Sequence, residues 1–221
     1  SVDSSPTLLT SWRAFPEDPM RSGNQSLVFD WNENENSLLT SGLAPIIRVW
    51  DLEKLLSVQD VPTLEDSYAT SLTHHHSQAL MITGYKNGAV QIFDQRSPPK
   101  YSSVNIYKEH KRKVINAKMP ASSNGSLLLS GSNTGEVRIW DIRKADKSLK
   151  VIQMHSQGMT AFDVHDHVPI FSTGGPSQTI KIKNYTTGNE LSAIRYHTNL
   201  IIGQRLGPIS CLCFHPYQFV L

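Results

Sequence analysis

The stretch LLLSGSNTGEVRIWDIR, residues 127–143, decides the fold. It begins with an apolar run, turns at the polar residues Asn133–Gly135, and then alternates β-branched and polar residues up to Trp140 and Asp141. Alternation with a period of two is typical of a β-strand that buries one face, and a short polar turn with glycine is typical of a hairpin. The stretch therefore predicts two antiparallel strands.

Three other parts of the chain repeat this pattern. They begin at Leu38, Leu80 and Ile170. Each unit ends in an aspartate or its amide, and these residues are Asp51, Asp94, Asp141 and Asn184. Successive units are therefore 43, 47 and 43 residues apart. Further strand-like runs precede and follow each pair of strands. Four strands in each unit are typical of a blade of a β-propeller.

The repeat predicts an all-β propeller segment that forms a single domain over residues 1–221. Its blade units cover roughly residues 27–60, 67–107, 113–154 and 158–195, with a partial unit at 207–221. An apolar run from Leu8 predicts one more strand before them. A ring of about seven blades would need roughly 300 residues. We therefore expect about four full blades of a seven-bladed ring, incomplete at both ends of the chain.

Two positions in each unit keep a fixed spacing. The residue before the terminal aspartate is Trp50, Phe93 or Trp140, whereas the fourth unit has Lys183. Ten residues earlier each unit has a small hydroxyl, at Thr40, Thr83, Ser130 and Thr173. A buried tryptophan needs an acceptor for its indole N–H, and a hydroxyl at this spacing can supply it. We expect the stem of Lys183 to lie along a blade rim with its ammonium group in solvent.

The third and fourth units each have a histidine before their first strand, His110 and His155. With the Ser/Thr-Gly and Trp-Asp pairs, these residues resemble the WD-repeat family. The resemblance implies a hydrogen-bond chain of histidine, hydroxyl, tryptophan and an acidic turn residue, for which the third unit offers Asn133 or Thr134. It assigns the structural lock of the blades to Thr40, Trp50, Asp51, Thr83, Phe93, Asp94, His110, Ser130, Trp140, Asp141, His155 and Thr173.

Some longer stretches are more particular than a WD-repeat consensus. They are IIRVWDLEKLLSVQDVPT from Ile46, TGYKNGAVQIFDQR from Thr83 and GPISCLCFHP from Gly207. In these stretches the chain is similar to the C-terminal WD-repeat domains of the raptor family, of the fungal type. The resemblance implies a non-catalytic scaffold of TOR complex 1 that recruits and presents substrates to the TOR kinase in nutrient and growth signalling.

The same resemblance implies protein partners, namely the TOR kinase and other subunits of TOR complex 1, and no cofactor. It implies a cytoplasmic location, with peripheral attachment to the lysosomal or vacuolar membrane through the complex. No apolar run approaches the ~20 residues of a membrane helix. The net charge of +2 argues against nucleic-acid binding, which usually shows a strongly basic domain. The alternative is a WD-repeat adaptor of another complex, such as a ubiquitin-ligase substrate receptor.

The run His74, His75 and His76 raises a second alternative, a metal-binding protein. On an extended chain His74 and His76 would share a face. A zinc site needs three or four ligands, however, and no further ligand pattern lies nearby in the sequence. We therefore interpret the run as a solvated loop between two strands. For the pair Cys211 and Cys213 we expect small buried residues in a core strand.

The densest basic stretch joins the second unit to the third. In propellers such connections between blades line one rim of the ring. We therefore interpret this stretch as an electrostatic contact site for an acidic partner or a phosphate. The candidate partner-binding rim comprises Lys108, His110, Lys111, Arg112, Lys113, Asn133 and Thr134. The chain shows no nucleophile–base pattern, no phosphate-binding loop and no paired carboxylates with a role in catalysis. We therefore predict no catalytic residue.

Overall fold

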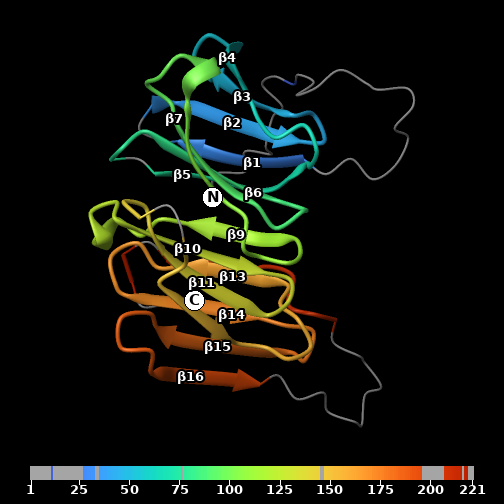
Figure 1. Cartoon of the computed structure of the whole chain (residues 1–221), viewed down its shortest axis with the longest axis vertical. Helices are drawn as coiled ribbons and strands as arrows, with labels where there is room; N and C mark the ends of the chain where they lie inside the picture. The colour runs from blue at the N-terminus through green and yellow to red at the C-terminus, as the bar shows by residue number, and fades with distance from the viewer. Residues whose placement is uncertain are drawn as a thin grey trace, which may run out of the picture.

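The computed structural model of the chain describes residue 11 and residues 27–32, 35–75, 77–144, 147–195, 207–215 and 217–218. These residues form four antiparallel sheets of four strands each, and the strands of every sheet are hydrogen-bonded in chain order. Figure 1 shows the sheets following one another along the molecule, from the sheet of β1–β4 at one end to that of β13–β16 at the other. The predicted all-β fold is confirmed.

Each sheet is a simple up-and-down array of short strands. The first sheet contains β1 (Leu27–Asn32), β2 (Ser37–Gly42), β3 (Ile46–Asp51) and β4 (Leu56–Pro62). The second contains β5 (Ala69–His75), β6 (Leu80–Tyr85), β7 (Val90–Asp94) and β8 (Ser103–Tyr107). The third contains β9 (Val114–Lys118), β10 (Leu127–Ser132), β11 (Glu136–Asp141) and β12 (Lys150–Gln153). The fourth contains β13 (Ala161–Val164), β14 (Ile170–Gly174), β15 (Thr179–Asn184) and β16 (Glu190–Arg195).

Two 3₁₀ turns lie wholly within the described residues. They are η2 (Pro99–Tyr101) and η3 (Ala121–Ser123). In this part of the chain no helix has the length and apolar character that a membrane span requires. The strand expected from Leu8 lies outside the described residues.

Apolar side chains of adjacent sheets form three cores, because alternate residues of each strand point to opposite faces. The core between the first and second sheets contains Leu39, Ile47, Val49, Met81 and Phe93. The core between the second and third contains Ile82, Val90, Ile92, Leu128 and Trp140. The core between the third and fourth contains Leu129, Val137, Ile139, Phe162 and Phe171. The sheets are therefore stacked face to face, like the blades of a propeller.

Hydrogen bonds also join the first strands of adjacent sheets. The carboxylate of Asp30 in β1 accepts a bond from the backbone N–H of His74 in β5 at 2.7 Å. The hydroxyl of Thr73 in β5 donates to the carbonyl oxygen of Ala117 in β9 at 2.6 Å. Each bond connects side chain to backbone, so it fixes the spacing of two sheets without depending on the neighbour's side chain.

Residues 207–215 lie against β13 through the same kind of contact. The carboxylate of Asp163 accepts a hydrogen bond from the backbone N–H of Phe214 at 2.7 Å. The hydroxyl of Thr160 donates to the carbonyl of Ile209. This segment thus occupies the position that the first strand of a following sheet would take.

Two expectations for this segment are wrong. The run from Ile209 is not a strand in the structure, because no described strand forms a backbone ladder with it. Cys211 and Cys213 are exposed and not buried in a core strand. The cause is the same in both cases, since a core strand is covered by its own sheet and the described residues supply no such sheet here.

Candidate protein-interaction surface

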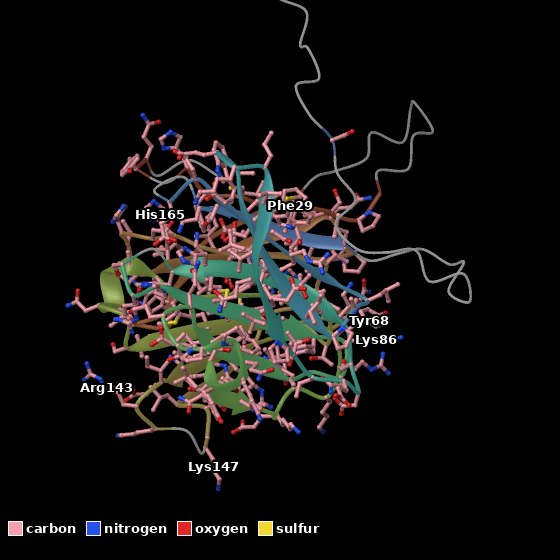
Figure 2. The ribbon with its side chains drawn as sticks, turned by 90° about the horizontal axis from the view of Figure 1, so that it is seen from above. Phe29, Tyr68, Lys86, Arg143, Lys147 and His165 are labelled. Atoms are coloured by element: carbon pink, nitrogen blue, oxygen red, sulfur yellow. The ribbon has the colours of Figure 1, made fainter. Side chains whose placement is uncertain are left out.

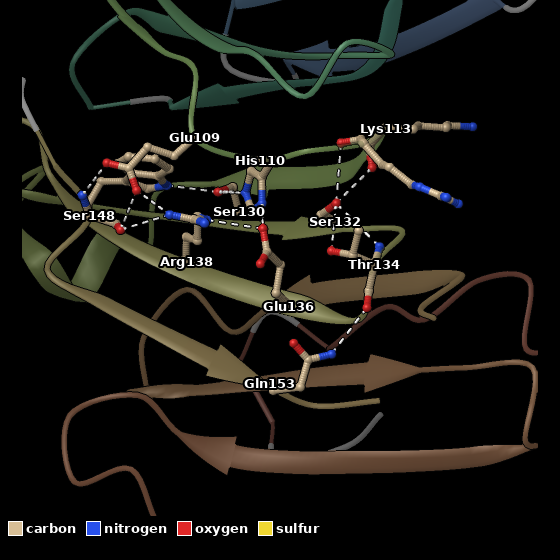
Figure 3. Close-up of polar contacts among 12 residues, drawn as sticks. Glu109, His110, Lys113, Ser130, Ser132, Thr134, Glu136, Arg138, Ser148 and Gln153 are labelled. Carbon is tan, nitrogen blue, oxygen red and sulfur yellow. Dashed lines mark hydrogen bonds and ion pairs between the residues drawn. The ribbon is translucent and has the colours of Figure 1, made fainter. Parts of the chain in front are cut away.

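The third sheet contains a continuous chain of buried hydrogen bonds (Figure 3). The indole N–H of Trp140 donates to the Oγ of Ser130 at 2.8 Å. That oxygen lies 2.7 Å from Nε2 of His110, and Nδ1 of His110 lies 2.7 Å from Oε1 of Glu136. Trp140, Ser130 and His110 are 1%, 0% and 4% exposed. The chain of contacts connects the loop before β9 to both central strands of the sheet.

With His110 neutral, the donors and acceptors of this chain fit only one direction. An indole N–H can only donate, so the oxygen of Ser130 accepts from Trp140 and offers its own proton to His110. A carboxylate accepts, so Nδ1 of His110 carries the ring proton and donates it to Glu136. Every buried polar atom of the chain then has a partner with His110 neutral.

The electrostatics of the pair agree with this assignment. Burial lowers the pKa of His110 below its ordinary value of 6.5, even though Glu136 acts in the opposite direction. Burial alone would raise the pKa of Glu136, but hydrogen bonds from His110 and Arg138 outweigh it and hold that pKa below its usual range. The neutral imidazole and the ionised carboxylate are therefore the stable forms of the pair.

Sequence reasoning missed the role of Glu136 and assigned it to Asn133 or Thr134. The hydroxyl of Thr134 instead donates to Ser132 Oγ at 3.2 Å, and the backbone N–H of Asn133 donates to the carbonyl of Lys113 at 2.9 Å. Neither side chain contacts His110. The signal that could have found Glu136 is an acidic residue at the start of the third strand rather than in the turn.

A second polar network continues from Glu136. Arg138 donates through Nε to Glu136 at 3.1 Å and through Nη1 to both Glu109 and Ser148. Glu109 also accepts from the backbone N–H and the hydroxyl of Ser148, at 3.1 and 2.8 Å. The acidic residue of the basic stretch is thus used internally, which leaves the neighbouring lysines without it.

The remaining sheets hold only parts of this lock. In the first, Trp50 Nε1 donates to Thr40 Oγ1 at 2.9 Å, and in the fourth, His155 Nε2 lies 3.0 Å from Thr173 Oγ1. In the second sheet, the side chain of Phe93 has no N–H to donate. The buried hydroxyl of Thr83 accordingly has no hydrogen-bond partner among the described residues. The side chain of Lys183 is 19% exposed and lies 3.9 Å from Glu190.

The terminal aspartates act in the following turn and do not contact the tryptophan lock. Asp51 Oδ1 accepts backbone bonds from Glu53 and Lys54 at 2.9 and 3.0 Å. Bonds of the same kind connect Asp94 to Arg96, Asp141 to Arg143, and Asn184 to Thr186 and Thr187. Asn184 can replace aspartate because an amide oxygen accepts the same bonds.

The structure exposes most of the predicted rim but not His110. The side chains of Lys108, Lys111, Arg112 and Lys113 are exposed, whereas that of His110 is 0% exposed. Including His110 in a partner-binding rim is therefore wrong, because both of its ring nitrogens are engaged inside the sheet.

Packing adds one cation that the sequence did not suggest, Lys86. The turn before β7 lies against the loop before β9, since a Cβ at Gly88 (φ +89°) would collide with the carbonyl of His110. Lys86 is exposed, and its Nζ lies 5.0 Å from the ring centroid of Tyr68. Figure 2 shows Tyr68 and Lys86 together on one side of the molecule.

We name the exposed cations of this edge the cationic rim. Its members are Lys86, Lys108, Lys111, Arg112 and Lys113. Within the described residues none of them forms an ion pair. The exposed Asn133 and the half-buried Thr134 border it, because the turn that carries them is bonded to the backbone of Lys113. The rim is an unneutralised positive surface.

The expected histidine loop is also corrected. His74 and His75 belong to β5, where His75 pairs with Leu80 of β6, and their side chains are buried. Strand β5 includes His74 and His75 because its backbone ladder with β6 extends as far as His75. His76 lies outside the described residues. Among the described residues no group of three or more His, Cys, Asp or Glu could hold a metal ion.

Comparison with known proteins identifies the chain. A family described as Nucleolar protein 10-like, N-terminal domain, which is a β-propeller, matches residues 20–217. The chain belongs to this β-propeller family. A chain in the crystal structure of the Mitotic Checkpoint Complex shares the fold. It superposes with a TM-score of 0.71 at 19% identity, and the match covers 87% of this chain and 56% of the other. The predicted WD-type propeller is confirmed.

Several of the similar proteins are raptor proteins or subunits of Target of rapamycin complex 1. The chain is 39% identical over 97% of its length to the raptor homologue of Dictyostelium discoideum, and 31% identical over 97% to the Target of rapamycin complex 1 subunit mip1 of Schizosaccharomyces pombe. The crystal structure of Chaetomium thermophilum Raptor superposes with a TM-score of 0.77 at 28% identity, covering 87% of this chain. The predicted relationship to the raptor family is confirmed.

The chain spans only a part of these relatives. It covers 14% of the Dictyostelium protein, 16% of mip1 and 18% of the Chaetomium chain. The relatives come from an amoeba and from fungi, and similar proteins occur in rice and Arabidopsis, so the matches do not single out the fungal type.

Proposed function

We propose that this chain is a propeller segment of a raptor-type scaffold subunit of TOR complex 1. The observation that carries the proposal is the 39% identity to a raptor homologue over 97% of the chain, joined to the structural match with Raptor. In this role the chain binds proteins and catalyses no reaction. It forms about four blades of a larger ring, of about seven blades, that is completed by other parts of the polypeptide.

The proposed partners are the TOR kinase and other subunits of the complex, and the subunit presents substrates to that kinase. The proposed location is the cytoplasm, with peripheral attachment to the lysosomal or vacuolar membrane through the complex. The titratable residues agree with a structural role, since the buried histidines His110 and His155 are engaged within their sheets.

Affinity purification of the full-length protein tests this function. We expect the tagged protein to co-purify the TOR kinase from cells of its own source. Copurification of a ubiquitin ligase without the kinase would instead support the adaptor alternative and overturn the proposal. Deletion of blade residues is unsuitable as a test, because it would expose apolar faces of the neighbouring sheets.

We propose the cationic rim as the surface of this chain that contacts an acidic segment of a protein partner. Support comes from its five exposed cations, which form no ion pair with any described residue, and from the internal use of Glu109. Opposite charges across a contact raise the association rate and make it sensitive to salt.

Charge reversal on a matched pair of surfaces tests the rim. We expect Lys111→Glu, Arg112→Glu and Lys113→Glu together to weaken association of the full-length protein with its complex by about ten-fold at low salt. The control is Arg143→Glu, Lys144→Glu and Lys147→Glu, which makes the same charge change. Figure 2 places Arg143 and Lys147 away from Lys86. Equal effects of both triple variants, or no effect of the first, would contradict the rim proposal.

A further inference from the structure

The loop between β7 and β8 carries the sequence Ser97-Pro98-Pro99-Lys100. A serine followed by proline, with a basic residue three positions after the serine, is the pattern on which proline-directed protein kinases act. Proline has no backbone N–H, so it suits a kinase pocket that offers no acceptor at that position. The lysine can pair with an acidic group of the kinase.

The pattern occurs once in the chain. The other Ser-Pro pair, Ser5-Pro6, has Leu8 at the third position after the serine and so lacks the basic residue. The corresponding loops after β3, β11 and β15 contain no Ser-Pro pair. The feature therefore belongs to one loop and not to the architecture of the repeat.

The structure presents this loop at the periphery of the second sheet. Ser97 is half-buried, and within the described residues its hydroxyl makes no hydrogen bond. Pro98 is exposed and extended, with φ −54° and ψ 142°. Lys100 is exposed, and Tyr101 is 72% exposed. Both residues that a kinase would read are thus exposed to solvent, and the serine between Arg96 and Pro98 is partly exposed.

Local bonds hold the loop, and its ends are anchored. The hydroxyl of the buried Ser102 donates to Pro99 O at 2.8 Å, and the backbone N–H of Gln95 donates to Ala79 O at 2.9 Å. The backbone N–H of Ser97 donates to Asp94 O at 3.2 Å, and that of Tyr101 donates to Pro98 O at 2.8 Å. The loop closes where Asp94 N donates to Ser102 O at 2.7 Å, at the edge of the sheet. Loops at a sheet edge open locally at lower cost than core strands, so a kinase can take up the segment around Ser97 while the sheet stays intact.

The loop can also accommodate a phosphate. Arg96 precedes Ser97, is 69% exposed, and pairs with Asp94 through Nε at 2.9 Å and through one terminal nitrogen at 2.8 Å. A guanidinium has five N–H donors, so Arg96 keeps donors that do not face Asp94. A phosphoserine carries about −1.5 to −2 charges at pH 7 and would find these donors within reach of the neighbouring residue.

We propose that Ser97 is a phosphorylation site for a proline-directed protein kinase that uses ATP. The Oγ of Ser97 attacks the γ-phosphorus of ATP, forming an O–P bond. The bond between that phosphorus and the β,γ-bridging oxygen breaks, and ADP leaves. The hydroxyl proton passes to the catalytic carboxylate of the kinase.

Mass spectrometry of the full-length protein tests the site. The protein is incubated with a cyclin-dependent kinase and ATP, and its phosphopeptides are measured after digestion with a protease that does not cleave at basic residues. We expect phosphate on Ser97 and its loss in Ser97→Ala. Pro98→Ala should reduce the modification at least ten-fold, and Lys100→Ala should reduce it several-fold.

A parallel reaction on heat-denatured protein keeps the result interpretable. The proposal is supported if the folded protein carries phosphate on Ser97, if Ser97→Ala lacks it, and if Pro98→Ala strongly reduces it. Absence of phosphate on folded protein, or its appearance only after denaturation, overturns it. Equal phosphorylation of Pro98→Ala also overturns it, because the kinase would then not be reading the Ser-Pro pair.

Discussion

Glu136 lies 2.7 Å from Nδ1 of His110, and this pair completes the buried lock of the third sheet. Glu136 is the first residue of β11, whereas His110 lies in the loop before β9. The carboxylate also binds Arg138, so one side chain serves the lock and the neighbouring polar network. Removing it should therefore affect the sheet more than removing either polar residue of the turn.

We expect Glu136→Gln to speed amide hydrogen exchange in β10 and β11 by about ten-fold or more, because hydrogen bonds to charged groups contribute roughly 1.5–3 kcal/mol each. The amide keeps the shape of the side chain and loses its charge. Hydrogen–deuterium exchange of the full-length protein, followed by mass spectrometry, measures the change. Asn133→Ala is the control and should leave both strands unchanged. A larger effect of Asn133→Ala than of Glu136→Gln would show that the turn, and not Glu136, stabilises the hydrogen-bond chain of the third sheet.

Ser130 provides a second prediction, since its Oγ contacts both Trp140 and His110. Ser130→Ala leaves two buried partners unsatisfied, and each unsatisfied group costs about 1–3 kcal/mol. Ser130→Thr keeps the hydroxyl, as Thr40 and Thr173 do in other sheets. We expect faster exchange in the third sheet for alanine only. Comparable exchange in the two variants would show that the hydroxyl contributes little.

Acid should weaken the third and fourth sheets through their histidines. Burial lowers the pKa of His110 and of His155 below 6.5, the ordinary value that applies to the unfolded chain. Below that pH the unfolded chain binds more protons than the folded one, so the free energy of unfolding falls as pH falls. It is fully restored above the unfolded pKa.

Protection factors, which correct amide exchange for its intrinsic pH dependence, provide the measurement. We expect them to decrease in β10 and β14 between pH 7.5 and 5.5. His110→Gln should lower protection of β10 at pH 7.5 and flatten its pH dependence, while β14 keeps the dependence due to His155. A pH dependence of β10 unchanged by this substitution would exclude His110 as its cause.

The periodic features of the sequence predicted the strands well, because they arise from local physics. Alternation, turn glycines and a ten-residue offset are enough to predict that Trp140 lies against Ser130. The role of Glu136 was not predicted, because it depends on the direction in which the His110 side chain points. A sequence pattern does not contain that direction. Lys86 escaped because it joins the rim by packing of one blade's turn on the next blade's loop.

The errors have similar physical origins. His74 and His75 were expected in a loop, but the backbone ladder between β5 and β6 continues through both residues. Cys211 and Cys213 were expected inside because the run is apolar, but burial also requires a covering sheet. Local composition predicts whether a segment can be buried, and only the surrounding chain decides whether it is.

The contact of Asp163 with Phe214 provides the last prediction. Asp163 accepts the backbone N–H of Phe214 at 2.7 Å and lies 3.6 Å from Lys118 Nζ, whereas Asp166 lies 3.2 Å from the same nitrogen. The two acids therefore share Lys118. Within the described part of the chain, Asp163 bonds to residues 207–215 and Asp166 does not.

Asp163→Ala should release this segment, and Asp166→Ala should not. A bond to a charged acceptor contributes roughly 1.5–3 kcal/mol, so exchange of the amide of Phe214 should accelerate about ten- to a hundred-fold in the first variant. Peptides covering residues 207–215 report the change in the full-length protein. If Asp166→Ala accelerated exchange equally, Lys118 and not the backbone bond would be holding the segment against β13.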